Sequence, residues 1–191
     1  MHLSAKCSIY YINQHHFPEH NMSDLNKSLF VSCIIGFFVV SVCGTLLHFL
    51  YDFSGNNLFA AVISPINESV WEHTKLLFFP MLLYGIFLSF HFHDKYAGIL
   101  PAFLAGLLGG CLFIPIFYYF YTGILGFGLR PVDIALFYLA VLLAFVITYR
   151  GSIANTFLPY RILLCSLTGI LLLCYVVFTF SPPKFGLFAA P

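Results

Sequence analysis

The sequence carries very little charge for its length. Asp, Glu, Lys and Arg together make up 8% of the 191 residues, whereas about a quarter of a typical soluble domain is charged. Hydrophobic residues make up 61%, and the mean hydropathy is +0.95. Because so few charged side chains cannot cover a water-facing surface, the composition predicts an integral membrane protein. A net charge of +1 also argues against nucleic acid as a partner, since nucleic-acid-binding proteins depend on a basic surface.

The sequence also lacks the cysteine and glycine patterns of several common functional sites. Five of its six cysteines lie inside apolar runs, and none has the C-x-x-C spacing of a metal site. We interpret them as small buried side chains rather than as a disulfide framework. No G-x-S-x-G, P-loop or dinucleotide-binding fingerprint occurs, so serine-hydrolase, NTPase and NAD chemistry have no support from a motif. The cysteines are Cys7, Cys33, Cys43, Cys111, Cys165 and Cys174.

Long apolar runs predict the fold class, an all-α polytopic bundle of transmembrane helices. A run of about 23 residues forms a helix about 34 Å long, which is enough to cross a hydrocarbon core of about 30 Å. Residues 53–63 are too short to cross and predict a re-entrant or interfacial segment. Residues 1–22 are expected to form a disordered polar tail, and residues 23–191 a single transmembrane domain. The five predicted spans are residues 29–51, 65–92, 97–121, 131–149 and 160–180.

The basic residues of the short loops predict a multi-pass orientation in the cell membrane. With the N-terminus inside, four basic residues fall on the inner side of the membrane and three on the outer side. This bias favours a cytoplasmic N-terminus. The inner residues are Lys27, Lys95, Arg150 and Arg161, and the outer ones are Lys75, Arg130 and Lys184.

Small residues recur every four positions in the third predicted span, at Ala102, Gly106 and Gly110. Side chains four residues apart share one face of a helix, and small ones let a second helix approach closely. This stripe predicts contact with a membrane partner or with a second copy of the chain.

Polar residues concentrate between Ser64 and Lys75, a stretch that holds two carboxylates, an imidazole, an amine and the single tryptophan. Ser64 and Pro65 are expected to start the second span as N-cap and first helical residue. A helix over this stretch places Glu68, Glu72 and Lys75 on one face, at i, i+4 and i+7. Ionisable groups at the mouth of a membrane segment are costly without partners and usually have a function.

A second polar pair ends the first predicted span. His48 and Asp52 are four residues apart and are expected to share one helix face. The short connection to the next span brings both helix ends to the same side of the membrane. The sequence therefore predicts one shared pocket, which contains His48, Asp52, Glu68, Glu72 and His73, with Ser54, Asn67, Ser69, Trp71 and Lys75 close by.

Two chemistries fit this predicted pocket, and a third functional class needs none. The first is metal-assisted hydrolysis of a lipid or other amphipathic substrate, with His48, Asp52 and His73 as ligands of zinc or another divalent metal. Glu68 or Glu72 would then be the general base. The second is a small transporter that uses the two glutamates as proton or cation sites. A non-catalytic partner subunit is a third class.

A structural interpretation of the same residues stays open beside these. Glu72 and Lys75 would form a buried ion pair, and Asn67 and Ser69 would cap a helix. Trp71 would anchor the helix at the membrane interface.

The stretch from Asn67 to Lys75 resembles the central N-E-S-x-W-E-H-x-K motif of a bacterial family of small integral membrane proteins of unknown function. The similarity covers roughly residues 28–191 and departs from the family at the C-terminal end. It implies a membrane-helical fold and no particular activity. The chain also has a fainter similarity to membrane hydrolases of the alkaline ceramidase and progestin-receptor type, which hold zinc with His and Asp inside a helix bundle. This similarity is an analogy at the level of the fold only.

Overall fold

The computed structural model describes residues 19–189. The predicted tail, residues 1–22, lies mostly outside this range, as does Cys7. The first described helix already begins at Glu19, so the last four residues of the predicted tail are helical.

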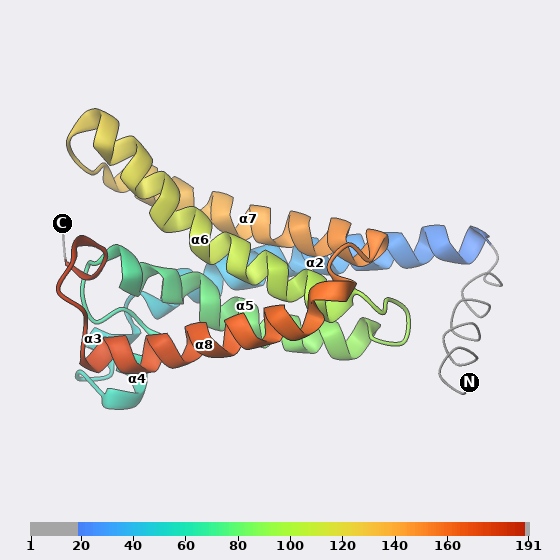
Figure 1. Cartoon of the computed structure of the whole chain (residues 1–191), viewed down its shortest axis with the longest axis horizontal. Helices are drawn as coiled ribbons and strands as arrows, with labels where there is room; N and C mark the ends of the chain where they lie inside the picture. The colour runs from blue at the N-terminus through green and yellow to red at the C-terminus, as the bar shows by residue number, and fades with distance from the viewer. Residues whose placement is uncertain (1–18, 190–191) are drawn as a thin grey trace.

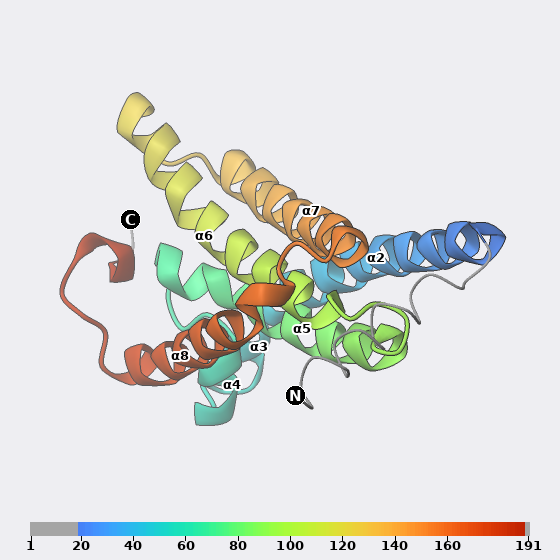
Figure 2. The same cartoon turned by 45° about the vertical axis from the view of Figure 1, so that its right-hand side comes forward.

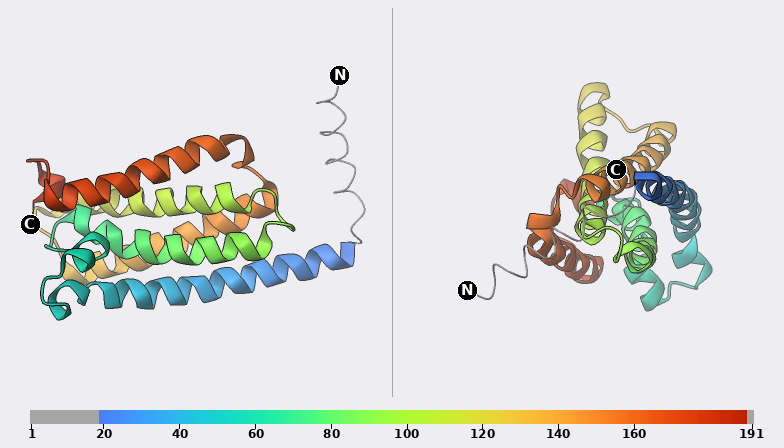
Figure 3. Two further views of the ribbon diagram at one scale, coloured as in Figure 1. Left: turned by 90° about the horizontal axis from the view of Figure 1, so that it is seen from below. Right: turned by 90° about the vertical axis from the view of Figure 1, so that its right-hand side faces the viewer.

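Five long helices make up most of residues 19–189 and run side by side along the long axis (Figure 1 and Figure 3). All five are long and apolar enough to cross a membrane, which confirms the predicted polytopic bundle and its five spans. Large apolar side chains such as Phe38, Phe90 and Ile162 are exposed on the outer faces, where a bilayer would cover them. The helices are α2 (Glu19–Leu47), α5 (Val70–Phe92), α6 (Ile99–Leu125), α7 (Arg130–Ala154) and α8 (Arg161–Phe180).

Short elements gather at one end of the bundle. Between α2 and α5 the chain forms α3 (Leu50–Phe53) and α4 (Leu58–Ile63), and the 3₁₀ turn η3 (Gly186–Phe188) follows α8 at the same end (Figure 1). A further 3₁₀ turn, η2 (Leu158–Tyr160), joins α7 to α8 at the other end. The short apolar segment predicted over residues 53–63 thus contains α4, a helix of six residues.

The start of α5 differs from the prediction that Ser64 and Pro65 begin the second span. Ser64 instead ends α4, where its hydroxyl donates to the Ala60 carbonyl at 2.9 Å. The helix begins only at Val70, with Ser69 as its N-cap. The Asn67 side chain accepts a hydrogen bond from the Ser69 amide at 2.9 Å, and such a local turn competes with helix formation over these residues.

The end of α2 also differs from the prediction. The helix stops at Leu47, and His48 and Phe49 form a turn before α3. There the Phe49 amide donates to the Leu46 carbonyl, three residues back, at 3.2 Å, and this tighter bond replaces the α-helical pattern. His48 and Asp52 are therefore not on one continuous helix, and the four-residue spacing does not place them on a shared face.

The small-residue stripe packs inside the chain, which corrects the prediction that a partner docks there. Ala102, Gly106 and Gly110 are all buried, and their neighbour is α7. A Cβ atom added at Gly106 would lie 2.3 Å from the Ala144 carbonyl oxygen. The close approach that these residues permit is used by α7, so the stripe is not available to a second protein.

The α6–α7 hairpin leans away from α5 and α8 toward the end of the bundle that holds the short elements (Figure 1 and Figure 2). At the other end α6 and α7 remain packed in the bundle. The end of the bundle where the hairpin diverges contains the cavity described next.

Candidate metal centre

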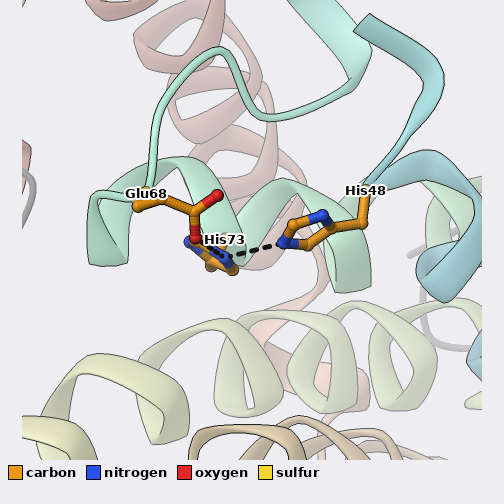
Figure 4. A group of neighbouring side chains, drawn as sticks. All are labelled: His48, Glu68 and His73. Carbon is orange, nitrogen blue, oxygen red and sulfur yellow. Dashed lines mark hydrogen bonds and ion pairs between the residues drawn. The ribbon is translucent and has the colours of Figure 1, made fainter. Parts of the chain in front are cut away.

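Three ionisable side chains converge at this end of the bundle: His48, Glu68 and His73 (Figure 4). The Nε2 atoms of His48 and His73 are 3.2 Å apart, and the Nε2 atom of His73 is 3.4 Å from a Glu68 carboxylate oxygen. One ligand atom from each residue lies within 4.8 Å of the other two. His48 comes from the turn after α2, Glu68 from the segment before α5, and His73 from the first turn of α5.

A hydrogen bond to the backbone determines which ring nitrogen of His73 is available to bind a metal. The Nδ1 atom of His73 lies 2.9 Å from the Ser69 carbonyl oxygen. Because a carbonyl only accepts, Nδ1 must carry the proton and donate it. In the neutral ring, the Nε2 atom then presents its lone pair toward Glu68 and His48. Histidines that bind metals are commonly oriented in this way by a hydrogen bond from the other ring nitrogen.

The His73 Nε2 atom and the Glu68 oxygen are electron-pair donors, and the His48 Nε2 atom is a third when the His48 proton lies on Nδ1, so a cation at their centre would then stabilise the arrangement. A proton shared by two of them is one such cation, and a divalent metal is another. A tetrahedral zinc ion, with ligand distances of about 2.0–2.1 Å, separates two of its ligand atoms by about 3.3 Å. Two of the three separations, 3.2 Å and 3.4 Å, match this spacing and the third is within 4.8 Å, so the His48, Glu68 and His73 group could hold a divalent metal ion.

The three side chains line a cavity of about 720 Å³. Its wall combines the end of α2, the start of α5, the middle of α6 and the first turns of α7. Apolar surface predominates in this lining. Besides the three converging residues, the lining consists of Thr45, Phe49, Val70, Leu76, Ile114, Tyr118, Arg130, Asp133, Ile134, Leu136, Phe137 and Tyr138.

Two charged residues of this lining, Arg130 and Asp133, are not among the residues predicted from sequence to form the pocket. They come from the first turn of α7, about 60 residues after the motif. The Asp133 carboxylate accepts a hydrogen bond from the Tyr121 hydroxyl, which in turn accepts one from the Leu129 amide at 3.1 Å. The predicted topology, which placed Arg130 on the same side of the membrane as Lys75, was the available signal for this end of α7.

Asp52 and Ser54 are not brought to the converging group. Both are exposed, and Asp52 is not part of the three-residue group or of the cavity lining. The Ser54 hydroxyl donates to the Tyr51 carbonyl at 2.8 Å within its own turn. The break after Leu47 is the physical reason, because it redirects the chain between His48 and Asp52.

Glu72 and Lys75 form a separate buried network. The Lys75 ammonium donates to Glu72 at 2.7 Å, to the Thr179 hydroxyl at 2.6 Å and to the Ala61 carbonyl at 3.0 Å. Its three protons therefore have three acceptors. The same Glu72 oxygen accepts from the Ile66 amide at 3.1 Å. This network joins α4, α5 and α8, as the structural interpretation of these two residues predicts.

The remaining motif residues also pack or cap. The Ser69 hydroxyl accepts from the Glu72 amide at 3.4 Å and is the N-cap of α5. Trp71 packs against Tyr175, Phe178 and Phe188, with ring centroids 4.9, 5.7 and 5.0 Å away. Its indole thus joins α5 to α8 and η3.

A protein-family model described as a family of unknown function (DUF6512) matches residues 19–190. No curated protein and no solved structure matches the chain. The site is thus described by its own geometry alone.

Proposed function

The chain belongs to the DUF6512 family, a family of unknown function, and from the geometry of its site we propose that it is a membrane-embedded, metal-dependent hydrolase. The observation that carries this proposal is the convergence of His48, Glu68 and His73 on the wall of a large cavity. The substrate we propose is a lipid or another amphipathic molecule.

Zinc is the metal that this ligand set favours. Two imidazoles and one carboxylate are the donors of several catalytic zinc sites, where three protein ligands leave the fourth position for water or substrate. The Glu68 side chain is 69% exposed and that of His73 29%, so the group is open toward solvent on one side. A closed structural site would instead surround the metal with four protein ligands.

Different residues of the cavity have different roles in the proposed hydrolysis. His48, Glu68 and His73 would hold a divalent cation, which would supply Lewis-acid activation of water near neutral pH. Glu68 joins the two histidines as a ligand, and Glu72 is bound to Lys75 outside the cavity lining. We therefore assign the proton-accepting role to Asp133, which lines the cavity. Its carboxylate takes a proton from water as the water oxygen attacks the substrate, and returns it to the leaving group.

The apolar part of the cavity supports an amphipathic substrate. Its volume of about 720 Å³ lies within the range of about 300–1,000 Å³ that is usual for small-molecule sites. Phe49, Ile114 and Phe137 contribute apolar surface to the wall. An alkyl chain can lie against this surface while the reacting group lies near the metal ligands.

Metal content is the first test of the proposal. Purified full-length protein is loaded with zinc and dialysed, and its metal content is measured by inductively coupled plasma mass spectrometry. We expect about one zinc ion per chain. His48→Ala and His73→Ala should each lose most of the zinc, because two remaining ligands bind it weakly. His91→Ala, at an exposed histidine in the last turn of α5, is the matched control and should keep it. Wild-type protein without zinc would refute the metal site.

The second test measures hydrolysis directly, with lipids as the substrates. The zinc-loaded protein is reconstituted into vesicles of a mixed polar lipid extract, and the lipids are quantified by mass spectrometry over time. We expect one lipid class to decrease while its two hydrolysis products increase, with no change for His73→Ala or Asp133→Asn. If the wild type binds zinc but leaves every lipid class unchanged, the hydrolase assignment is refuted.

A transporter that uses Glu68 and Glu72 as one coupled pair finds less support. Glu68 lines the cavity, whereas Glu72 is buried in the network with Lys75 and Thr179. The two carboxylates lie in different environments, so a single ion cannot use both.

A further inference from the structure

Arg130 lines the same cavity as the proposed metal ligands. It is the first residue of α7, and the chain has only eight lysines and arginines in all. Among residues 19–189, no carboxylate forms an ion pair with its guanidinium. Nearby Asp133 is hydrogen-bonded to Tyr121. Arg130 is exposed, so its guanidinium is accessible, and an arginine without an ion-pair partner is well suited to bind an anion.

We infer, on the basis of the proposed metal site, that the cavity binds an amphiphile with a phosphate-bearing headgroup and that Arg130 recognises the phosphate. This names the substrate class of the proposed hydrolase.

The charges of the cavity agree with this assignment only when a metal is bound. Glu68 and Asp133 carry two negative charges and Arg130 one positive charge, so the lining by itself has a formal charge of −1 with neutral histidines. A divalent cation changes this to +1. An anionic headgroup is then attracted to the cavity, with the metal and the guanidinium as two separate positive centres. Guanidinium groups bind phosphate oxygens with two parallel hydrogen bonds, which makes arginine well suited to this role.

The shape and lining indicate an amphiphile rather than free phosphate. A cavity of about 720 Å³ is far larger than inorganic phosphate needs, since volumes of this order hold drug-sized ligands. Most of its wall is apolar, including Val70, Leu76, Ile134 and Leu136. Ile134 is 59% exposed, so the wall continues onto the outer surface of α7. The chain of a lipid can follow this surface into the cavity, whereas free phosphate would leave the apolar wall without a partner.

Binding of three simple probes tests the inference without relying on turnover. Zinc-loaded full-length protein in an uncharged maltoside detergent is titrated calorimetrically with dodecyl phosphate, dodecanol and inorganic phosphate. Dodecyl phosphate is expected to bind at least tenfold more tightly than either of the others. Arg130→Gln should weaken its binding by about tenfold to a hundredfold, the usual effect of losing hydrogen bonds to a charged group. Arg161→Gln, at an exposed arginine that is not part of the cavity lining, should bind like the wild type.

The zinc content of each sample separates this inference from the proposed function. An Arg130→Gln protein with wild-type zinc and wild-type affinity for dodecyl phosphate overturns the role of Arg130 and leaves the metal site standing. Equal affinities for dodecanol and dodecyl phosphate overturn phosphate recognition. If inorganic phosphate binds as tightly as dodecyl phosphate, the amphiphile is wrong and the ligand is free phosphate. A wild-type protein that holds no zinc overturns the proposed function itself.

Discussion

Replacing Lys75 with methionine should destabilise the protein strongly, because it leaves a buried carboxylate without its counter-charge. Lys75 is fully buried and Glu72 is 2% exposed, and their charged atoms are 2.7 Å apart. Methionine has a similar length and flexibility, so the change removes the charge and creates little empty space. Thr179 keeps its bond to the Tyr175 carbonyl at 2.6 Å, whereas the Ala61 carbonyl loses its bond from Lys75. The main cost therefore comes from Glu72.

The magnitude follows from what the buried carboxylate retains. After Lys75→Met, Glu72 keeps the Ile66 amide at 3.1 Å but no positive charge. Removing one partner of a buried ion pair costs about 3–5 kcal/mol. We expect Lys75→Met to lower the free energy of unfolding by this amount. Glu72→Gln should cost a comparable amount, since it leaves the ammonium unpaired. The double variant should cost at least about 2 kcal/mol less than the sum of the two single variants, because residues in direct contact are coupled.

The single tryptophan provides the assay. Trp71 lies on α5 close to this network and packs against Tyr175 of α8, so its fluorescence reports the separation of these helices. Unfolding is followed by titrating the purified protein in mixed micelles with sodium dodecyl sulfate. Lys184→Met, at an exposed lysine between α8 and η3, is the control and should change the free energy by less than about 0.5 kcal/mol. A loss below about 1 kcal/mol for Lys75→Met, or additive single variants, would refute the reasoning.

Three further predictions use the same preparations. Gly106→Ala should cost about 1–3 kcal/mol in the unfolding assay because its Cβ atom would meet the Ala144 carbonyl. The control Gly123→Ala, with no atom within 4 Å of the added Cβ atom, should be neutral or stabilising. Equal effects of the two substitutions would contradict the close packing of α6 and α7. Tyr175→Phe should cost about 1 kcal/mol, since it removes the 2.7 Å bond to Thr74, and no loss would show that this bond contributes nothing. Zinc affinity, measured by competition with a chromophoric chelator, should fall as the pH is lowered, because ligand atoms must be free of protons to bind a metal; an affinity independent of pH would argue against this ligand set.

The membrane-helical architecture could be predicted because it depends on local composition. Each span is a continuous apolar run long enough to cross a bilayer, and no tertiary contact is needed to recognise it. Helix ends were less predictable, since they depend on individual hydrogen bonds. The Asn67 side chain bonded to the Ser69 amide is one such bond, and it moves the start of α5 from Pro65 to Val70.

That shift also explains why the structure brings together only some of the residues that were expected to share one pocket. Helical spacing placed Glu68 and Glu72 on one face, but Glu68 precedes the helix, so the spacing does not apply to it. Glu68 joins His48 and His73 at the cavity, whereas Glu72 turns toward Lys75. The helical spacing thus did not predict that the polar residues of the motif divide between the cavity and the buried network.

By itself, the sequence determined that this chain is a bundle of five apolar helices, and that its few polar side chains, concentrated between Ser64 and Lys75, would need partners. Scarcity of charge decides this, because hydrocarbon tolerates ionisable groups only where they are paired. The tertiary structure alone decided which partner each group has. Arg130 and Asp133 reach the cavity from a helix far along the chain, and Thr179 reaches Lys75 from α8. Contacts between residues so distant in sequence depend on how the helices pack, which no local pattern encodes.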